Sequence, residues 1–115
     1  MSEHDYRLPM HQMLEHAREA VEMIRGRTRP ELRTNRMLQL ALVHLVEVVG
    51  EAATRVSPAG QTRHPGIPWG RAVATRNRMV HGYDRIDYDV VWDTIAEDFP
   101  PLVAALEHAL SGESG

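Results

Sequence analysis

A chain of 115 residues is long enough for one domain with a single modest core and too short for two ordinary ones, so residues 1–115 are expected to form one domain. With 43% hydrophobic and 25% charged residues it resembles soluble globular proteins, and the absence of cysteine excludes disulfides, thiolate zinc sites and cysteine nucleophiles. The formal net charge of −3 excludes a chain-wide cationic field, so any contact with nucleic acid must be local.

The amino-terminal stretch and the apolar runs argue against a secreted or membrane protein. The first residues, MSEHDYRLPM, carry acidic and polar groups where a secretory signal has a basic end followed by an apolar stretch. No apolar run approaches the roughly 18 residues that cross a bilayer. Together with the lack of cysteine, this predicts a cytoplasmic protein with no membrane partner.

Apolar residues at spacings of three and four predict a first helix over about 6–25, ending near Gly26. Arg25, Arg27 and Arg29 follow closely. Cations are favourable at the negative end of a helix, so this cluster is either a solvated helix end or a local contact with an RNA backbone.

The second predicted helix begins at Pro30 and runs to about Val56, with apolar residues almost all round. A helix of this kind needs more cover than one short domain provides. We therefore expect a second copy of the chain to pack against it in a two-fold homodimer.

Residues 57–68 hold three prolines and two glycines, which predicts a loop between helices. Pro68 is placed to open a third helix, and Gly82 suits the left-handed position that would end it. No strand-type alternation of useful length is present.

Asp87 is a plausible cap for a fourth helix, which Pro100 and Pro101 are expected to break. A last short helix covers about 101–110, and the tail at about 111–115 is expected to be disordered. The fold class predicted is all-α, an antiparallel bundle of four to five helices.

A polar cluster in the stretch ATRNRMVHGYDRIDYD has little use in a core: Arg76, Asn77, Arg78, His81 and Tyr83. Residues five apart on a helix are separated by about 140° around its axis, so Arg76 and His81 can converge only where the helix ends. Asn77 lies four residues before His81, where its amide could hydrogen-bond the imidazole ring and set its tautomer.

Histidine, arginine and a polar orienting group suffice for RNA cleavage without a metal ion, because the ribose 2′-hydroxyl can attack its own phosphodiester. His81 would move a proton, and Arg76 would stabilise charge on the phosphoryl oxygens. One histidine cannot easily serve both the attacking and the leaving oxygen, so two clusters are expected to face one cleft across the dimer. The alternative is structural, with Arg76 and His81 capping the helix and pairing with nearby aspartates, and Tyr83 a packed aromatic.

His44, Glu47 and Glu51 lie at helical spacings of three and four and mimic a metal-binding face. Two carboxylates and one histidine without a further partner make a weak site. The sequence therefore predicts no metal site and no cofactor.

The stretch RNRMVHGY resembles the R-x4-H-x-Y pattern of the HEPN superfamily, and its context is similar to the HepT-like branch. Thr75 stands where relatives commonly carry a bulkier apolar residue, a departure that affects packing more than chemistry. Four further stretches support the resemblance: VVGEAA at 48–53, PWGRAVATRNRMVHGY at 68–83, IDYDVVWDTI at 86–95 and DFPPL at 98–102.

The resemblance implies a homodimeric ribonuclease toxin of a type VII toxin–antitoxin system, with a nucleotidyltransferase antitoxin as its partner. It places the catalytic roles on Arg76 and His81 and a supporting role on Asn77. It also implies that the antitoxin transfers AMP from ATP to Tyr83, which would add bulk and phosphate charge where the RNA must bind. The alternative is a non-catalytic helical module that binds a nucleotide or a partner and works with a nucleotidyltransferase.

Two further residues are predicted to support the site, Arg78 within the cluster and Glu51 in the second helix. Glu51 falls on a stretch shared with the family. It either forms an ion pair with an arginine such as Arg71 or Arg76, or orients the catalytic arginine.

Overall fold

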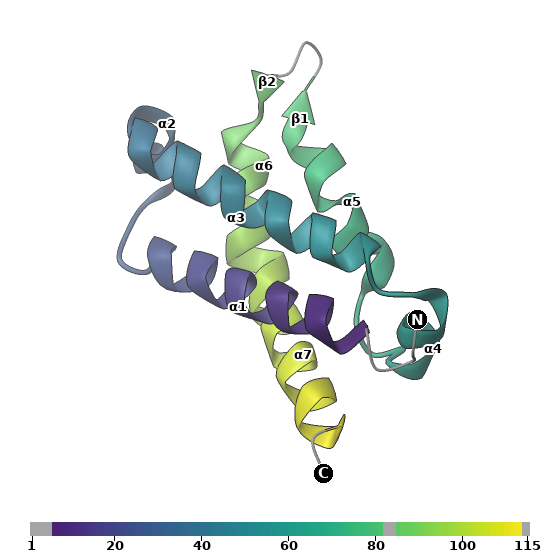
Figure 1. The fold of residues 1–115 in the computed structure, drawn as a ribbon. Helices are drawn as coiled ribbons and strands as arrows, with labels where there is room; N and C mark the ends of the chain where they lie inside the picture. Colours follow the sequence, from purple (N-terminus) through teal and green to yellow (C-terminus); the bar gives the residue numbers. More distant parts are fainter. Residues whose placement is uncertain (1–5, 82–84, 114–115) are drawn as a thin grey trace.

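The computed structural model describes residues 6–81 and 85–113, which form an all-α helical bundle as predicted (Figure 1). One pair of two-residue strands joins the helices. In chain order the elements are α1 (Arg7–Ile24), α2 (Arg29–Thr34), α3 (Arg36–Thr54), α4 (Pro58–Arg63), α5 (Trp69–Met79), β1 (Val80–His81), β2 (Arg85–Ile86), α6 (Tyr88–Asp93), the π-helical turn η2 (Thr94–Asp98) and α7 (Phe99–Glu113).

The core lies between α1, α3, α5 and the continuous column formed by α6, η2 and α7. In Figure 1, α1 and α3 run antiparallel to each other, and the column crosses behind both. Apolar side chains from each of these elements are fully buried, so burial of apolar surface holds the bundle together. The largest fully buried side chains include Met10, Met13, Leu42, Val46, Val49, Met79, Ile95, Phe99 and Leu106.

The first helix is confirmed and the second predicted helix is divided. α1 spans Arg7–Ile24, and Gly26 takes a left-handed φ of 77° just beyond it. The chain then breaks at Asn35, whose backbone is extended and whose side chain accepts a hydrogen bond from the Leu38 amide at 3.0 Å. Asn35 is thus the N-cap of α3, which begins six residues later than predicted.

The predicted loop at 57–68 contains a short helix, α4. Ser57 caps it by accepting a hydrogen bond from the Gly60 amide at 3.1 Å, and Pro58 occupies its first position. Gly60 faces the Tyr6 ring so closely that an added Cβ would lie 2.7 Å from Tyr6 Cγ. The expectation of a loop was wrong for these six residues because proline and serine here start a helix.

The third helix, α5, ends three residues before the predicted stop. Met79 is its last residue, Val80 is extended at φ −90° and ψ 117°, and β1 pairs with β2 in antiparallel register, Val80 with Ile86 and His81 with Arg85. The Asp87 amide donates to the Met79 carbonyl at 2.8 Å and closes the pair. Gly82 itself lies outside the described residues.

Two prolines fail to break the carboxy-terminal column. Asp87 caps α6 as predicted, accepting hydrogen bonds from the Asp89 and Val90 amides. The helix then widens into η2, where the Phe99 amide donates to the Thr94 carbonyl five residues back, and Pro100 and Pro101 follow in the first turn of α7. α7 continues to Glu113 and includes three residues expected in a disordered tail.

Arginines after α1 bind carboxylates. Arg25 pairs with Glu22 and Arg27 with Glu31, both on neighbouring turns. These exposed pairs are those of a solvated helix end, and the contact with an RNA backbone considered from the sequence stays a prediction.

Arg29 and Arg33 tie α2 to α6. Arg29 pairs with Asp93, and the hydrogen bond to Asp93 raises the pKa of the Arg29 guanidinium. Arg33 donates to Asp89 at 2.8 Å, and this bond lowers the pKa of the Asp89 carboxyl. All four side chains are partly exposed, so these pairs fix orientation more than they add stability.

Two large apolar side chains are exposed on the outer side of α3. Met37 is 82% exposed and Leu40 56% exposed, whereas the inner side of the helix is buried against α1 and α5. Among the helices in the described ranges, α3 alone is long and apolar enough to cross a membrane by length and composition. Core helices of soluble proteins pass the same test, so the expectation of no membrane partner stays a prediction.

Candidate functional site

The three arginines of α5 point to different surroundings. Arg71 and Arg78, seven residues apart on one face, both bind the Asp98 carboxylate of η2, at 3.0 and 3.1 Å. Asp98 is 19% exposed, so these two ion pairs fasten α5 to the carboxy-terminal column. Arg78 was predicted to support the site, but its guanidinium forms this structural ion pair with Asp98.

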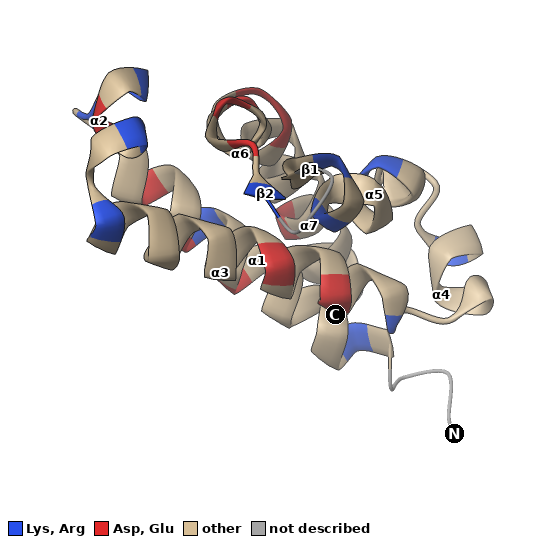
Figure 2. Ribbon diagram, turned by 90° about the horizontal axis from the view of Figure 1, so that it is seen from above, with Lys and Arg blue, Asp and Glu red and all other residues tan. Residues whose placement is uncertain are grey.

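Arg76 lies on another face of α5 and is exposed. Its guanidinium makes no hydrogen bond or ion pair with any residue that the structure describes. Its base is held against α3, because a Cβ added at Gly50 would lie 3.5 Å from Arg76 Cβ. Figure 2 shows arginine positions along α5 and at β2, with acidic positions on α3 and α6 beside them. Arg76 therefore offers a cation that has no partner among the described residues, on a stem packed against α3.

The other predicted site residues follow Arg76 across the end of the helix. Asn77 is exposed in the last turn of α5, and His81 is the second residue of β1. The helix thus ends between Arg76 and His81, which removes the regular geometry that would separate them. The His81 side chain and the whole of Tyr83 lie outside the described part of the chain, so the predicted bond from Asn77 to the imidazole is untested.

Glu51 is exposed in the last turn of α3, next to Gly50. Within the described ranges its carboxylate has no ion pair, and Arg71, one of its expected partners, binds Asp98 instead. The expected ion pair with an arginine is therefore not formed with Arg71 or Arg76. Gly50, the residue before Glu51, packs against the Arg76 stem. The orienting role of Glu51 stays a prediction.

Arg85 was missed by the sequence reasoning. It is the residue of β2 directly opposite His81, it is exposed, and it has no ion pair with the residues that the structure describes. A hollow of about 380 Å³ lies beside it, with Arg33, Asp87 and Asp89 on its walls. The signal in the sequence was the glycine between two short runs, which is typical of a hairpin and sets residues 81 and 85 opposite each other.

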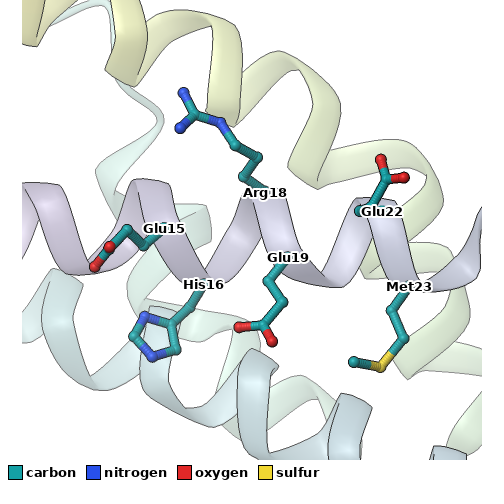
Figure 3. Close-up of a pocket in the computed structure, with 6 residues that line it drawn as sticks. All are labelled: Glu15, His16, Arg18, Glu19, Glu22 and Met23. Carbon is teal, nitrogen blue, oxygen red and sulfur yellow. The ribbon is translucent and has the colours of Figure 1, made fainter.

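A larger hollow of about 710 Å³ lies along α1, away from the predicted site residues. Figure 3 shows Arg18 and Glu22 pointing toward α7, and His16, Glu19 and Met23 pointing toward α3. Its walls carry one arginine, Arg18, and three glutamates, and Arg18 is bound to Glu107 at 2.6 Å. Size alone does not make this hollow a site, because its charged groups do not converge on one point.

His44, Glu47 and Glu51 of α3 have the spacing of a metal-binding face. Among the described residues, no group of three or more His, Asp or Glu side chains is placed to hold a metal ion. The structure thus assigns no ligand role to His44, Glu47 or Glu51.

Comparisons with known proteins agree on one family. The family described as ribonuclease HepT-like matches residues 13–109. A protein of Methanocaldococcus jannaschii whose name marks it as a candidate RNase is 29% identical over 107 residues, 93% of this chain and 98% of its own. One of Thermococcus cleftensis named "Probable ribonuclease HepT" is 32% identical over 98 residues, 82% of this chain and 89% of its own. No solved structure matches the chain. With the family match covering most of its length, the chain belongs to the ribonuclease HepT-like family.

Proposed function

We propose that the chain is an endoribonuclease that cleaves RNA without a metal ion and uses Arg76 and His81 as catalytic residues. The observation that supports this most directly is the state of Arg76, which is exposed and unpaired among the described residues while Arg71 and Arg78 of the same helix bind Asp98. A free guanidinium can bind phosphate through two parallel hydrogen bonds. The family and the relatives named as ribonucleases favour RNA as the substrate.

In the proposed reaction the ribose 2′-oxygen attacks the adjacent phosphorus, and the bond from phosphorus to the 5′-oxygen breaks. One His81 imidazole accepts the proton of the 2′-hydroxyl, and a second, protonated imidazole donates a proton to the departing 5′-oxygen. Arg76 stabilises the negative charge that builds on the phosphoryl oxygens. The products carry a 2′,3′-cyclic phosphate and a 5′-hydroxyl, and no protein nucleophile takes part.

The second imidazole comes from a second copy of the chain in this proposal. The outer face of α3 supports such a homodimer. Met37, Leu40, His44, Val48 and Glu51 fall within an arc of roughly 80° on the helix, and the first two are large exposed apolar side chains. This face ends at Glu51, and the preceding residue, Gly50, packs against the turn of α5 that bears Arg76, so dimerisation through the face would set two sites near one cleft.

Cleavage by the purified protein is expected to persist in a chelator such as EDTA, because the proposed chemistry needs only protein side chains and the substrate's own hydroxyl. The measurement is RNA cleavage by gel with and without EDTA, together with the chemistry of the new ends. Cyclic phosphate at the 3′ end supports the mechanism. Loss of activity in EDTA that returns with added Mg²⁺ or Mn²⁺ would contradict it.

The proposed RNase activity is controlled by modification of a tyrosine. We infer that a nucleotidyltransferase antitoxin transfers AMP from ATP to the Tyr83 hydroxyl, with pyrophosphate leaving. Tyr83 stands two residues after His81 in the sequence. A nucleotide attached there brings bulk and a negative phosphate into the space that the RNA phosphate needs, and so excludes substrate by both size and charge.

Incubation with the antitoxin and ATP is expected to raise the intact mass of the chain by one or more AMP units and to silence cleavage in proportion to the modified fraction. Tyr83→Phe is the matched variant, because it removes only the hydroxyl and should escape both effects. Modification at another residue would contradict the assignment of Tyr83. Modification of a chain that never cleaves RNA would favour the non-catalytic partner-binding module instead.

A further inference from the structure

Gly50 of α3 is buried against one turn of α5. A Cβ added at Gly50 would lie 3.1 Å from Thr75 Oγ1, 3.5 Å from Arg76 Cβ and 3.6 Å from the Ala72 carbonyl oxygen. The first distance is tighter than ordinary Cβ contacts, whereas the other two are normal van der Waals contacts. Because Gly50 has no side chain, α3 and α5 can approach closely at Thr75, the residue that precedes Arg76.

The crowded atom on α5 is not free to move aside. Thr75 is 1% exposed, and its hydroxyl donates a hydrogen bond of 2.6 Å to the Ala72 carbonyl. Turning the hydroxyl away would break that bond in a buried place, where an unpaired hydroxyl is costly. An added methyl at position 50 would instead push the turn of α5 by a few tenths of an ångström. Arg76 is the next residue on that turn and would move with it.

We propose that Gly50 is a positioning residue for catalysis, which sets the place of the Arg76 stem through its contact with Thr75. The proposal rests on the catalytic role proposed for Arg76. Arg76 lacks a partner among the described residues that would fix its guanidinium, so its position depends on where α5 lies against α3. Gly50 acts through the hydroxyl oxygen of Thr75, a residue that the sequence marked only as smaller than its counterparts in relatives.

Gly50→Ala is expected to lower kcat for RNA cleavage by about tenfold with little change in KM, because small misplacements of a group that acts on the transition state reduce the rate of the chemical step. Gly70→Ala is the matched control. Gly70 lies in α5 itself, is exposed, and an added Cβ there meets nothing within 4 Å. It is expected to cleave at the wild-type rate.

A second substitution tests the route through Thr75. Thr75→Ala removes the hydroxyl oxygen that lies 3.1 Å from the added Cβ and leaves only the two ordinary contacts. Gly50→Ala combined with Thr75→Ala is therefore expected to recover kcat to within about twofold of Thr75→Ala alone, a coupling that a double-mutant cycle measures. The test also works if Gly50→Ala alone does not fold. In that case a double variant that is folded and active supports the proposal.

Three outcomes would overturn the proposal. Gly50→Ala could cleave at the wild-type rate, or the double variant could remain as slow as Gly50→Ala, or the loss could fall entirely on KM. Arg76→Ala, measured in parallel, separates these failures from failure of the proposed function. If Arg76→Ala is inactive while Gly50→Ala is unaffected, the catalytic arginine stands and only the positioning role of Gly50 is lost.

Discussion

Arg76→Ala and His81→Ala are each expected to reduce RNA cleavage by about 10³-fold, because each removes a group that acts on charge or protons in the transition state. Removal of Arg76 should leave folding intact, since the side chain is exposed and has no ion pair among the described residues. The measurement is kcat/KM on a single RNA substrate, with thermal unfolding of the same samples. A surface substitution of this kind changes stability by about 0.5 kcal/mol or less.

Arg71→Ala is the matched control for Arg76→Ala. It removes the same side chain from the same helix, but Arg71 binds Asp98 on another face. Its cleavage rate should stay near that of the wild type, with a small loss of stability from the broken, partly exposed ion pair. Equal losses of activity in both variants would mean that α5 contributes general positive charge rather than a specific guanidinium.

The sequence was sufficient for the class of fold, because apolar spacing is a strong signal in long helices. α1 follows its predicted span within a residue at each end. The breaks were harder to predict because they depend on single side chains. Asn35 divides the second helix through one bond to the Leu38 amide, and Ser57 starts α4 in a stretch that its prolines and glycines marked as a loop.

The carboxy-terminal column shows how a strong local rule can fail. Paired prolines normally end a helix because each lacks an N–H group and clashes with the preceding turn. Here the wider turn of η2 precedes them, and Pro100 and Pro101 are the second and third residues of α7 instead. Phe99 and Leu102 on either side are buried in the core. Tertiary packing therefore favours continuation of the column over the break that the local sequence predicts.

The sequence was sufficient to predict which residues form the candidate site, but it predicted only part of their contacts. Arg76 and His81 stood out because they flank the end of a helix, and the helix does end between them. The sequence could not show which arginine of α5 would lack a partner among the described residues, because that depends on Asp98, which lies 20 residues beyond Arg78 in the chain. Sequence spacing cannot place such a carboxylate, and the same holds for the contact of Gly50 with Thr75.

α3 connects the two parts of the proposed mechanism. Its buried side carries Gly50 and holds the turn of α5 that bears Arg76. Its outer side carries Met37 and Leu40, which are exposed in the single chain although both are large and apolar. One helix would thus fix the arginine within a protomer and bring a second protomer to it. A change on the outer side should then impair catalysis without touching the site.

Leu40→Glu is expected to weaken the proposed homodimer by about 100-fold, because it places a charge in the centre of an apolar interface. At RNase concentrations below the new dissociation constant, cleavage should fall in parallel with the dimer fraction. Sedimentation velocity gives that fraction, and cleavage assayed over the same range of concentrations gives the activity. Raising the protein concentration should restore activity to Leu40→Glu, which no concentration should do for Arg76→Ala.

Leu8→Glu is the matched control for Leu40→Glu. Leu8 is an equally large apolar side chain, 67% exposed, but it lies at the start of α1 and not on the outer face of α3. The same substitution there should leave both assembly and cleavage unchanged. A Leu40→Glu protein that sediments as a monomer and still cleaves RNA at the wild-type rate would show that one protomer suffices. The second imidazole would then have to be replaced by another proton donor within the same chain.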